Sequence, residues 1–167
     1  MDTVVLRDAS AADSAALAEL HRRTALHAYA HIFPPEAQTP TLESLVDDWQ
    51  HRLQRADPRH ACAVAEHDTN AVGVIVAGTD PRDPSRGHLS RLYVDPPLWG
   101  RGIGTRLYER ALEHLRAQGF SAASLWVLEA NAHARRWYEQ RGWTPTEDRV
   151  VTYATAGIED IGYELML

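Results

Sequence analysis

The sequence contains no lysine, a single cysteine and no long apolar run. Without lysine there is no Walker-A phosphate loop, no Schiff-base chemistry and no kinase-type catalytic lysine. One cysteine, Cys62, excludes an internal disulfide and a cysteine-rich zinc site. No apolar stretch approaches the roughly 20 residues of a membrane span, and the N-terminal segment lacks the pattern of a signal peptide. We therefore expect a cytoplasmic protein that does not associate with membranes.

The charge balance is acidic, with 17 basic and 23 acidic side chains and a formal net charge of −6. Nucleic-acid binding needs a basic footprint, so this balance argues against a nucleic-acid partner. A chain of 167 residues is long enough to bury a core without disulfides or metals. We expect residues 1–167 to form a single domain.

Apolar periodicity and turn residues predict strands and helices in the order βααβββαβαββ. The predicted strands are residues 4–7, 61–65, 71–77, 88–94, 124–128, 149–152 and 161–166. The first two helices begin after the capping residues Ser10 and Thr41, the third follows the glycine-rich turn, and the fourth begins at Asn131. This order implies a mixed α/β sheet covered by helices.

The most specific feature is the glycine-rich turn between the strand that ends at Val94 and the following helix. Backbone N–H groups at a helix start lack partners, the helix dipole adds positive character, and glycine lets an anion approach the backbone. The turn therefore predicts a phosphate or pyrophosphate site, flanked by arginine side chains. Its residues are Gly100, Arg101, Gly102, Ile103, Gly104, Thr105 and Arg106.

Two familiar phosphate motifs do not fit this turn. A Walker-A loop requires lysine, and a Rossmann fingerprint requires a third glycine where this sequence has Thr105 or Leu107. A nucleotide-binding module is therefore disfavoured. A turn whose glycines serve geometry alone remains an alternative.

Two sequence blocks resemble the GNAT acyltransferase superfamily. The segment from Arg101 to Thr105 matches the core of its phosphate loop, Arg/Gln-x-x-Gly-x-Gly/Ala, with Trp99 at the position that is usually Arg or Gln. The block from Asn131 to Trp143 resembles the family pattern Asn-x6-Tyr-x3-Gly-aromatic. The resemblance is strongest over residues 88–143.

This resemblance implies a fold, a co-substrate and an activity. The fold is a mixed, mostly antiparallel central sheet of about seven strands, flanked by about four helices and split in a V shape. The co-substrate is acetyl-CoA, with its pyrophosphate on the glycine-rich turn and its pantetheine arm paired with the backbone of Leu92, Tyr93 and Val94. The activity is acetyl transfer to the amine of a small molecule or peptide. Small members of the family also suggest a homodimer.

Acetyl transfer to an amine needs a proton donor for the departing thiolate and a hydrogen-bond donor for the thioester oxygen. By resemblance, Tyr138 is the candidate general acid. Asn131 lies two helical turns before it on the same face and is a candidate to hold the pantetheine or to position a water. As alternatives, Asn131 is only a helix cap and Tyr138 only a core aromatic. The oxyanion donor is expected to be a backbone N–H near Leu92 or Tyr93.

The candidate general base is His88. Many relatives carry an acidic residue at the matching position early on the strand, and histidine can take the amine proton directly or through water. A surface histidine without a catalytic role is an equal alternative. His31 and Glu129 are weaker candidates for shaping the acceptor site.

The acceptor pocket is expected to come from the first two helices, their join at residues 29–35 and the late loop at residues 153–158. Tyr29, Phe33 and Trp126 are lining candidates. Asp47, Asp48 and Asp160 are candidates to attract a cationic amine. No metal site is expected, since His27 and His31 lack a third ligand and Cys62 has the pattern of a small buried residue. The alternative function is a catalytically degenerate acyl-CoA-binding sensor, which the departure at Trp99 leaves open.

Overall fold

The computed structural model describes residues 3–167, and its secondary structure confirms the predicted order of strands and helices. Three short 3-10 turns, Ala11–Asp13, Pro96–Leu98 and Ala154–Ala156, supplement the main elements. The helices are α1 Ser14–Tyr29, α2 Leu42–Leu53, α3 Ile103–Ala117 and α4 Ala132–Glu139. The strands are β1 Val5–Asp8, β2 Ala61–His67, β3 Asn70–Thr79, β4 Gly87–Val94, β5 Ala122–Leu128, β6 Thr144–Tyr153 and β7 Ile158–Met166.

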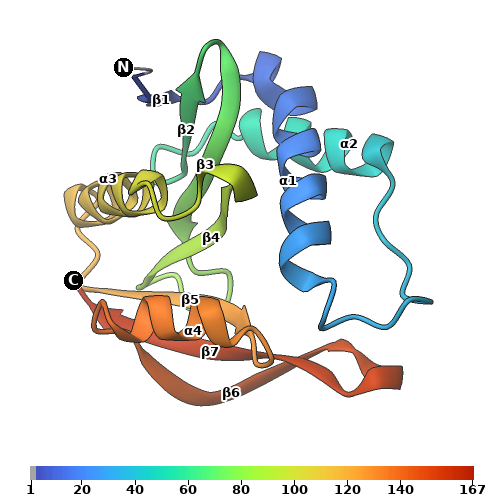
Figure 1. The fold of residues 1–167 in the computed structure, drawn as a ribbon. Coiled ribbons are helices and arrows are strands. Elements are labelled where there is room, and N and C mark those ends of the chain that lie inside the picture. Colours follow the sequence, from blue (N-terminus) through green and yellow to red (C-terminus); the bar gives the residue numbers. More distant parts are fainter. Residues whose placement is uncertain (1–2) are drawn as a thin grey trace.

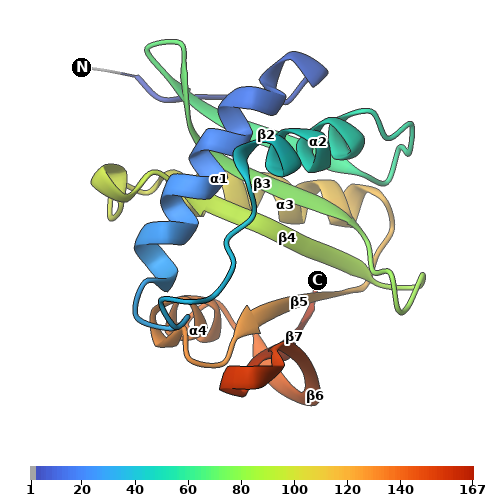
Figure 2. The same ribbon diagram turned by 90° about the vertical axis from the view of Figure 1, so that its right-hand side faces the viewer.

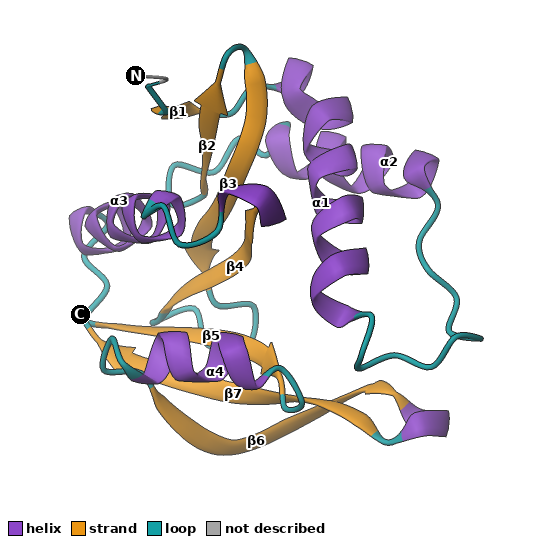
Figure 3. Ribbon diagram, viewed as in Figure 1, coloured by secondary structure: helices purple, strands orange, loops and turns teal. Residues whose placement is uncertain are grey.

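The seven strands form one sheet in the order β1-β2-β3-β4-β5-β7-β6. Every neighbouring pair is antiparallel except β4 and β5, which run parallel (Figures 1 and 3). This is the mixed, mostly antiparallel sheet with four helices that the resemblance implies. The single parallel contact, between β4 and β5, joins two antiparallel halves of the sheet.

Helices cover both faces of the sheet, and alternation along the strands decides which residues face which helix. On β3, Val74 and Val76 pack with buried residues of α1 and α2, whereas Ile75 and Ala77 pack with those of α3. Figure 2 shows α1 and α2 in front of β2, β3 and β4, with α3 behind them. One face of the sheet is therefore covered by α1 and α2 and the other by α3.

The sheet splits between β4 and β5. Their parallel pairing consists of Gly87 with Ala123 and His88 with Ser124. Beyond that point β4 carries a bulge, because its register with β3 shifts and Arg91 adopts φ 58. A bulge bends its strand and strengthens the local twist. Past the bulge, β4 still pairs with β3, but its other edge is free of β5.

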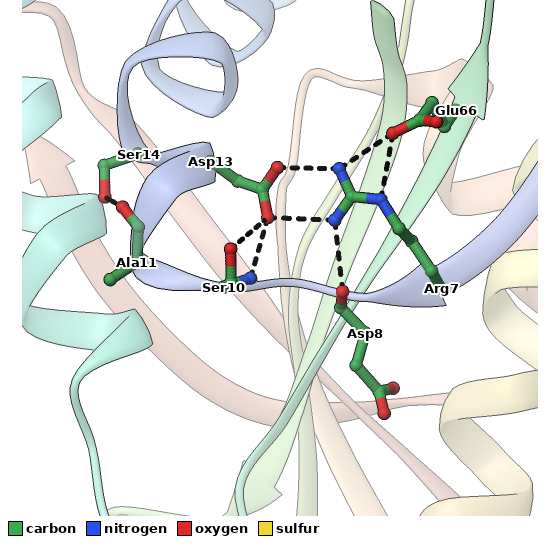
Figure 4. A network of polar contacts seen from close by, with 7 residues as sticks. All are labelled: Arg7, Asp8, Ser10, Ala11, Asp13, Ser14 and Glu66. Atoms are coloured by element: carbon green, nitrogen blue, oxygen red, sulfur yellow. Dashed lines mark hydrogen bonds and ion pairs between the residues drawn. The ribbon is translucent and has the colours of Figure 1, made fainter. Parts of the chain in front are cut away.

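At the opposite end of the sheet, a polar cluster ties β1 to the start of α1 and to β2 (Figure 4). The Arg7 guanidinium donates to both Asp13 carboxylate oxygens at 2.7 and 2.9 Å and to Glu66 Oε2 at 2.9 Å. Asp13 also accepts from the Ser10 backbone N–H at 2.7 Å, which forms a capping box between Ser10 and Asp13. We call this cluster the Arg7 network. It stabilises the edge strand rather than any cleft.

Candidate active site

A cleft of about 1510 Å³ opens where β4 and β5 separate. Its walls come from the end of α1, from β4 and the turn before α3, from the far part of β5, and from α4. Most pockets for small ligands measure about 300–1,000 Å³. The cleft is therefore large enough for an extended ligand together with a second, smaller one.

The glycine-rich turn forms one end of this cleft. Gly102 is the N-cap of α3 with φ 79, and Gly100 has φ 77, conformations that L side chains rarely adopt. A Cβ atom at either position would meet nothing within 4 Å, so the turn presents bare backbone to the cleft. Because the first N–H groups of a helix have no intrahelical acceptor, those of α3 are available to an anion. The turn residues that line the cleft are Gly100, Gly102, Ile103, Gly104 and Thr105.

The arginines of this site differ from those that the turn suggests. Arg101 is exposed and Arg106 donates to the Val4 carbonyl at 3.0 Å, and neither lines the cleft. Arg141, just after α4, donates to Thr105 Oγ1 at 3.0 Å, and its guanidinium lies 3.6 Å from the centre of the Trp137 ring. Arg136 also lines the cleft. The arginines that line this end of the cleft are thus Arg136 of α4 and Arg141 just after it, while cofactor contacts of Arg101 and Arg106 stay predictions.

Leu92, Tyr93 and Val94 line the cleft along the free edge of β4. The Tyr93 side chain leaves this edge and its hydroxyl bonds His21 Nε2 at 3.0 Å in the core. Trp99 donates its indole N–H to the Val94 carbonyl at 2.6 Å. The strand therefore offers mainly its backbone groups to a ligand, as an edge strand offers them to another strand.

Trp99 closes one corner of the cleft with two histidines. Its ring is stacked on His133 of α4, with centroids 5.8 Å apart, and meets His27 of α1 edge-on at 5.2 Å. The residue that departs from the family pattern thus links three elements around the glycine-rich turn. Nothing in the sequence pattern signals this contact.

Helix α4 contributes Asn131 and Tyr138 to the cleft. Asn131 is the helix cap, since its side-chain oxygen accepts from the Ala134 N–H at 3.1 Å. The Tyr138 ring packs against Trp137 and Trp143, and its hydroxyl makes no hydrogen bond within residues 3–167. Burial raises the pKa of Tyr138 well above its usual range. The hydroxyl is therefore a protonated, unpaired donor.

His88 lies at the apex of the split and lines the cleft. Its Nδ1 is 2.8 Å from Ser124 Oγ on β5, and that hydroxyl donates to Asp80 Oδ2 at 2.5 Å. Asp80 follows β3 and is only 6% exposed. Burial lowers the pKa of His88, against the raising effect of the Asp80 charge. We call Asp80, Ser124 and His88 the His88 network; its first two members were not predicted from the sequence.

The predicted acceptor residues divide into two groups. Tyr29 and Trp126 line the cleft, and the Arg82 guanidinium lies 4.4 Å from the centre of the Trp126 ring. Phe33 stands outside the lining, with its ring 6.2 Å from those of both Tyr29 and Tyr153. It packs against other aromatic residues, and its role in binding an acceptor stays a prediction.

Charge at the acceptor end is mixed. Of the three predicted aspartates, Asp160 lines the cleft and Asp47 does not. Asp48 is paired with Arg52 at 2.9 Å and Arg91 at 3.4 Å, and both arginines line the cleft. His31 reaches the lining as well, whereas Glu129 does not. The acceptor end of the cleft is thus lined by both acidic and basic side chains.

Neither a metal cluster nor a membrane helix is found in the described part of the chain. Across residues 3–167, no group of three or more histidine, cysteine or acidic side chains could hold a metal ion. Over the same residues, none of the helices has the length and apolar character to cross a membrane. Cys62 is buried, and burial raises the pKa of its thiol, so it is a poor nucleophile.

Comparison with known proteins places this chain in a family. Residues 22–143 match the family model of the Acetyltransferase (GNAT) family, so the chain belongs to that family. Mycothiol acetyltransferase of Beutenbergia cavernae is 36% identical over 145 residues, which cover 84% of this chain but 45% of that protein. Phosphinothricin N-acetyltransferase of Streptomyces viridochromogenes is 28% identical over 165 residues, covering 96% and 85%. The chain thus spans less than half the length of the first relative.

Solved structures agree with the fold. The paia N-acetyltransferase of Thermoplasma acidophilum, in complex with coenzyme A, matches with a TM-score of 0.79, 20% identity and 99% of both chains covered. The protein yncA of Salmonella typhimurium, solved with its cofactor acetyl-CoA, matches with a TM-score of 0.74, 20% identity and coverage of 99% and 94%. At this identity the likeness shows a shared fold.

Proposed function

We propose that this chain is an acetyl-CoA-dependent N-acetyltransferase that acts on the primary amine of a small molecule or peptide, within one domain. The observation that carries the proposal is the free edge of β4. It runs from the glycine-rich turn to the apex of the split, with an unpaired tyrosine hydroxyl and a histidine in the same cleft. Two relatives are named acetyltransferases of mycothiol and phosphinothricin, which supports the reaction class but not a particular acceptor.

The cleft fits acetyl-CoA on features of its own. Bare backbone at Gly100 and Gly102 and the start of α3 suit the pyrophosphate, with Arg136 and Arg141 as the nearby cations. The backbone edge of Leu92, Tyr93 and Val94, apart from the Val94 carbonyl that accepts from Trp99, suits the amide groups of the pantetheine arm. Asn131 keeps its side-chain nitrogen available, because only its oxygen caps α4.

Acetyl-CoA would supply an acetyl thioester whose C–S bond breaks as the C–N bond to the acceptor amine forms. In this proposal Tyr138 Oη gives its proton to the departing sulfur, because this hydroxyl stays protonated, has no partner within residues 3–167 and lines the cleft. His88 accepts the proton that the amine must lose. Direct attack in a ternary complex needs no covalent enzyme intermediate, and the buried Cys62 thiol is not suited to form one.

The acceptor end of the cleft favours an amine that also carries an anionic group. Arg91 and Asp160 both act electrostatically on Tyr29, so a cation and an anion lie near this ring, while Arg91 also shares Asp48 with Arg52. An amine paired with a carboxylate, as in an amino acid, matches both signs of charge. An acceptor panel should therefore include amino acids as well as simple amines and peptides.

Calorimetry with acetyl-CoA, followed by thiol release across that panel, tests the proposal. Two matched variants sharpen it: Gly102→Ala and Gly119→Ala both force alanine into a left-handed conformation with open space around the new Cβ. Gly102 faces the cleft, whereas Gly119 lies at the other end of α3. Only Gly102→Ala should weaken acetyl-CoA binding, although both should cost about 1 kcal/mol of stability.

The outcomes separate the two candidate functions. Failure of the wild-type protein to bind acetyl-CoA would overturn the whole proposal. Binding without thiol release for any amine would instead support the acyl-CoA-binding sensor.

A further inference from the structure

The His88 network joins β5 to the β3–β4 loop and to β4, which lie 44 and 36 residues earlier in the sequence. Asp80 lies in the β3–β4 loop, Ser124 lies on β5 and His88 lies on β4, opposite Ser124 at the last parallel pair before the split. Asp80 is buried and held on its other oxygen by the Arg82 backbone N–H at 2.8 Å. The network is therefore anchored at its buried end.

The direction of its hydrogen bonds follows from the chemistry of the groups. A carboxylate only accepts, so the bond between Asp80 and Ser124 uses the single hydroxyl proton of Ser124. At 2.5 Å this bond has the length of a charge-assisted O–H···O⁻ contact. Ser124 Oγ must then accept from His88, so Nδ1 of the neutral imidazole carries the proton.

The other ring nitrogen is free. His88 Nε2 makes no hydrogen bond within residues 3–167. This atom is not fully buried, and His88 lines the cleft. In the Nδ1–H tautomer this nitrogen carries a lone pair. It is therefore able to accept a proton from a group in the cleft.

We propose that Asp80 and Ser124 are positioning residues that hold neutral His88 as the Nδ1–H tautomer, with Nε2 as the proton acceptor of the reaction. This inference rests on the proposed acetyltransferase function. The proton leaves the ammonium form of the acceptor, forms an N–H bond at Nε2, and passes to solvent after the acetyl group has moved. Neither Asp80 nor Ser124 changes its net protonation in this step.

The charges around His88 support such a role. Asp80 is the one group of the described residues whose charge shifts the pKa of His88, and it opposes the lowering caused by burial. Arg55 and His60, from the segment before β2, line the same cleft, and Arg82 lies over Trp126 of β5. The remaining β5 partner, Ser124, is uncharged. The imidazole is therefore kept neutral near neutral pH while retaining a carboxylate behind it.

Long-range ¹H–¹⁵N correlation of the free protein tests the tautomer without any substrate. The His88 signals are identified by their loss in His88→Gln. We expect Nδ1–H in the wild type and in Ser124→Thr, which retains the hydroxyl, and a change toward Nε2–H in Ser124→Ala. A wild-type Nε2–H tautomer, or a tautomer unchanged in Ser124→Ala, would overturn the proposal.

Thiol-release kinetics across pH provide the second readout. Ser124→Ala should lower kcat/KM about tenfold, part of the roughly 10²–10⁴ that a positioned base contributes, and Ser124→Thr should restore most of it. The matched control is Ser121→Ala, at the exposed residue just before β5, which should behave as wild type. Equal rates and pH profiles for Ser124→Ala and Ser121→Ala, in an active enzyme, would refute the positioning role and leave the acetyltransferase function standing. A wild-type protein that releases no thiol would refute that function. The tautomer measurement would still test whether Asp80 and Ser124 position His88.

Discussion

The Arg7 network and the His88 network are built from similar groups but end differently. In the Arg7 network, Arg7 and Asp13 pair in two parallel bonds and Glu66 and Ser10 complete the set (Figure 4). In the His88 network, a buried carboxylate and a hydroxyl are satisfied, but the last atom, His88 Nε2, has no partner in residues 3–167. We call the Arg7 network closed, because its groups bond to one another, and the His88 network open, because its last atom has no partner among these residues.

Their places in the fold explain the difference. The Arg7 network fastens the edge strand β1, where the cost of ordering a short strand must be offset by tertiary bonds. The His88 network lies at the split between β4 and β5, beside the large cleft. A polar network that stops at an accessible acceptor in a cleft is suited to proton transfer, whereas a closed one contributes mainly to stability. Substitutions in the two networks should therefore change different quantities.

The largest effect is expected for His88→Gln. Glutamine keeps much of the size of the side chain but cannot take up a proton near neutral pH, so kcat/KM should fall about 100-fold. The acid limb of the pH–rate profile should disappear, while the free energy of unfolding changes by about 1 kcal/mol for the lost bond to Ser124. His114→Gln, on α3 and outside the cleft, is the control and should keep the acid limb. An acid limb that survives in His88→Gln would remove His88 from the base role.

Tyr138→Phe extends the comparison to single hydroxyls and should have the next largest effect. Removal of the Tyr138 hydroxyl, which has no partner within residues 3–167, should lower kcat about tenfold. The dissociation constant of acetyl-CoA should stay nearly constant. Tyr108→Phe is the matched control, because the Tyr108 hydroxyl is closed: it accepts from Trp143 Nε1 at 3.0 Å. That variant should lose about 1–3 kcal/mol of stability, because it leaves a buried N–H unpaired, and keep its turnover. Wild-type turnover in Tyr138→Phe would exclude the acid role.

Asp80→Asn should change the rate less, but it should shift the acid limb of the pH–rate profile in a defined direction. The Asp80 charge raises the pKa of His88, so its removal should lower that pKa and move the acid limb of kcat/KM to lower pH. The plateau should fall by a few-fold, because the charge-assisted bond to Ser124 is weakened. Asp83→Asn, in the same loop but exposed to solvent, is the control and should leave the limb in place. A limb that moves to higher pH in Asp80→Asn would contradict this electrostatic account.

Sequence periodicity was sufficient for the order of elements and for the glycine-rich turn, because these depend on neighbouring residues. Asn131 was predicted as a helix cap and is one. The first half of β6 was missed, since Pro145 interrupts the strand pattern and is tolerated only because β6 is an edge strand. Local sequence signals thus predicted most helix and strand boundaries to within a few residues.

The site needed contacts that no local signal carries. Arg141 reaches Thr105 across 36 residues, and Ser124 reaches Asp80 across 44. Serine and aspartate are common surface residues, so neither is noticeable before the sheet brings them together. The bulge at Arg91 was equally hidden, because a left-handed conformation at a residue other than glycine depends on tertiary packing. The glycine-rich turn and side chains such as His88 and Tyr138 were therefore predictable, whereas the distant partners Arg141, Asp80 and Ser124 were not.

The smallest effect is expected for Asp13→Asn, and it should change stability alone. Arg7 lowers the pKa of Asp13 from 3.8 to about 2, so this carboxylate stabilises the fold above pH 3.8 and loses its contribution as the pH falls toward 2. Because Arg7 is partly exposed and solvent screens the pair, the loss at neutral pH should be about 1 kcal/mol in urea unfolding. The difference from wild type should shrink as the pH approaches 2, and kcat/KM should not change. Asp8→Asn, whose carboxylate is 83% exposed and paired with Arg110, should cost less. A loss of activity in Asp13→Asn at unchanged stability would break the distinction between a closed network and an open one.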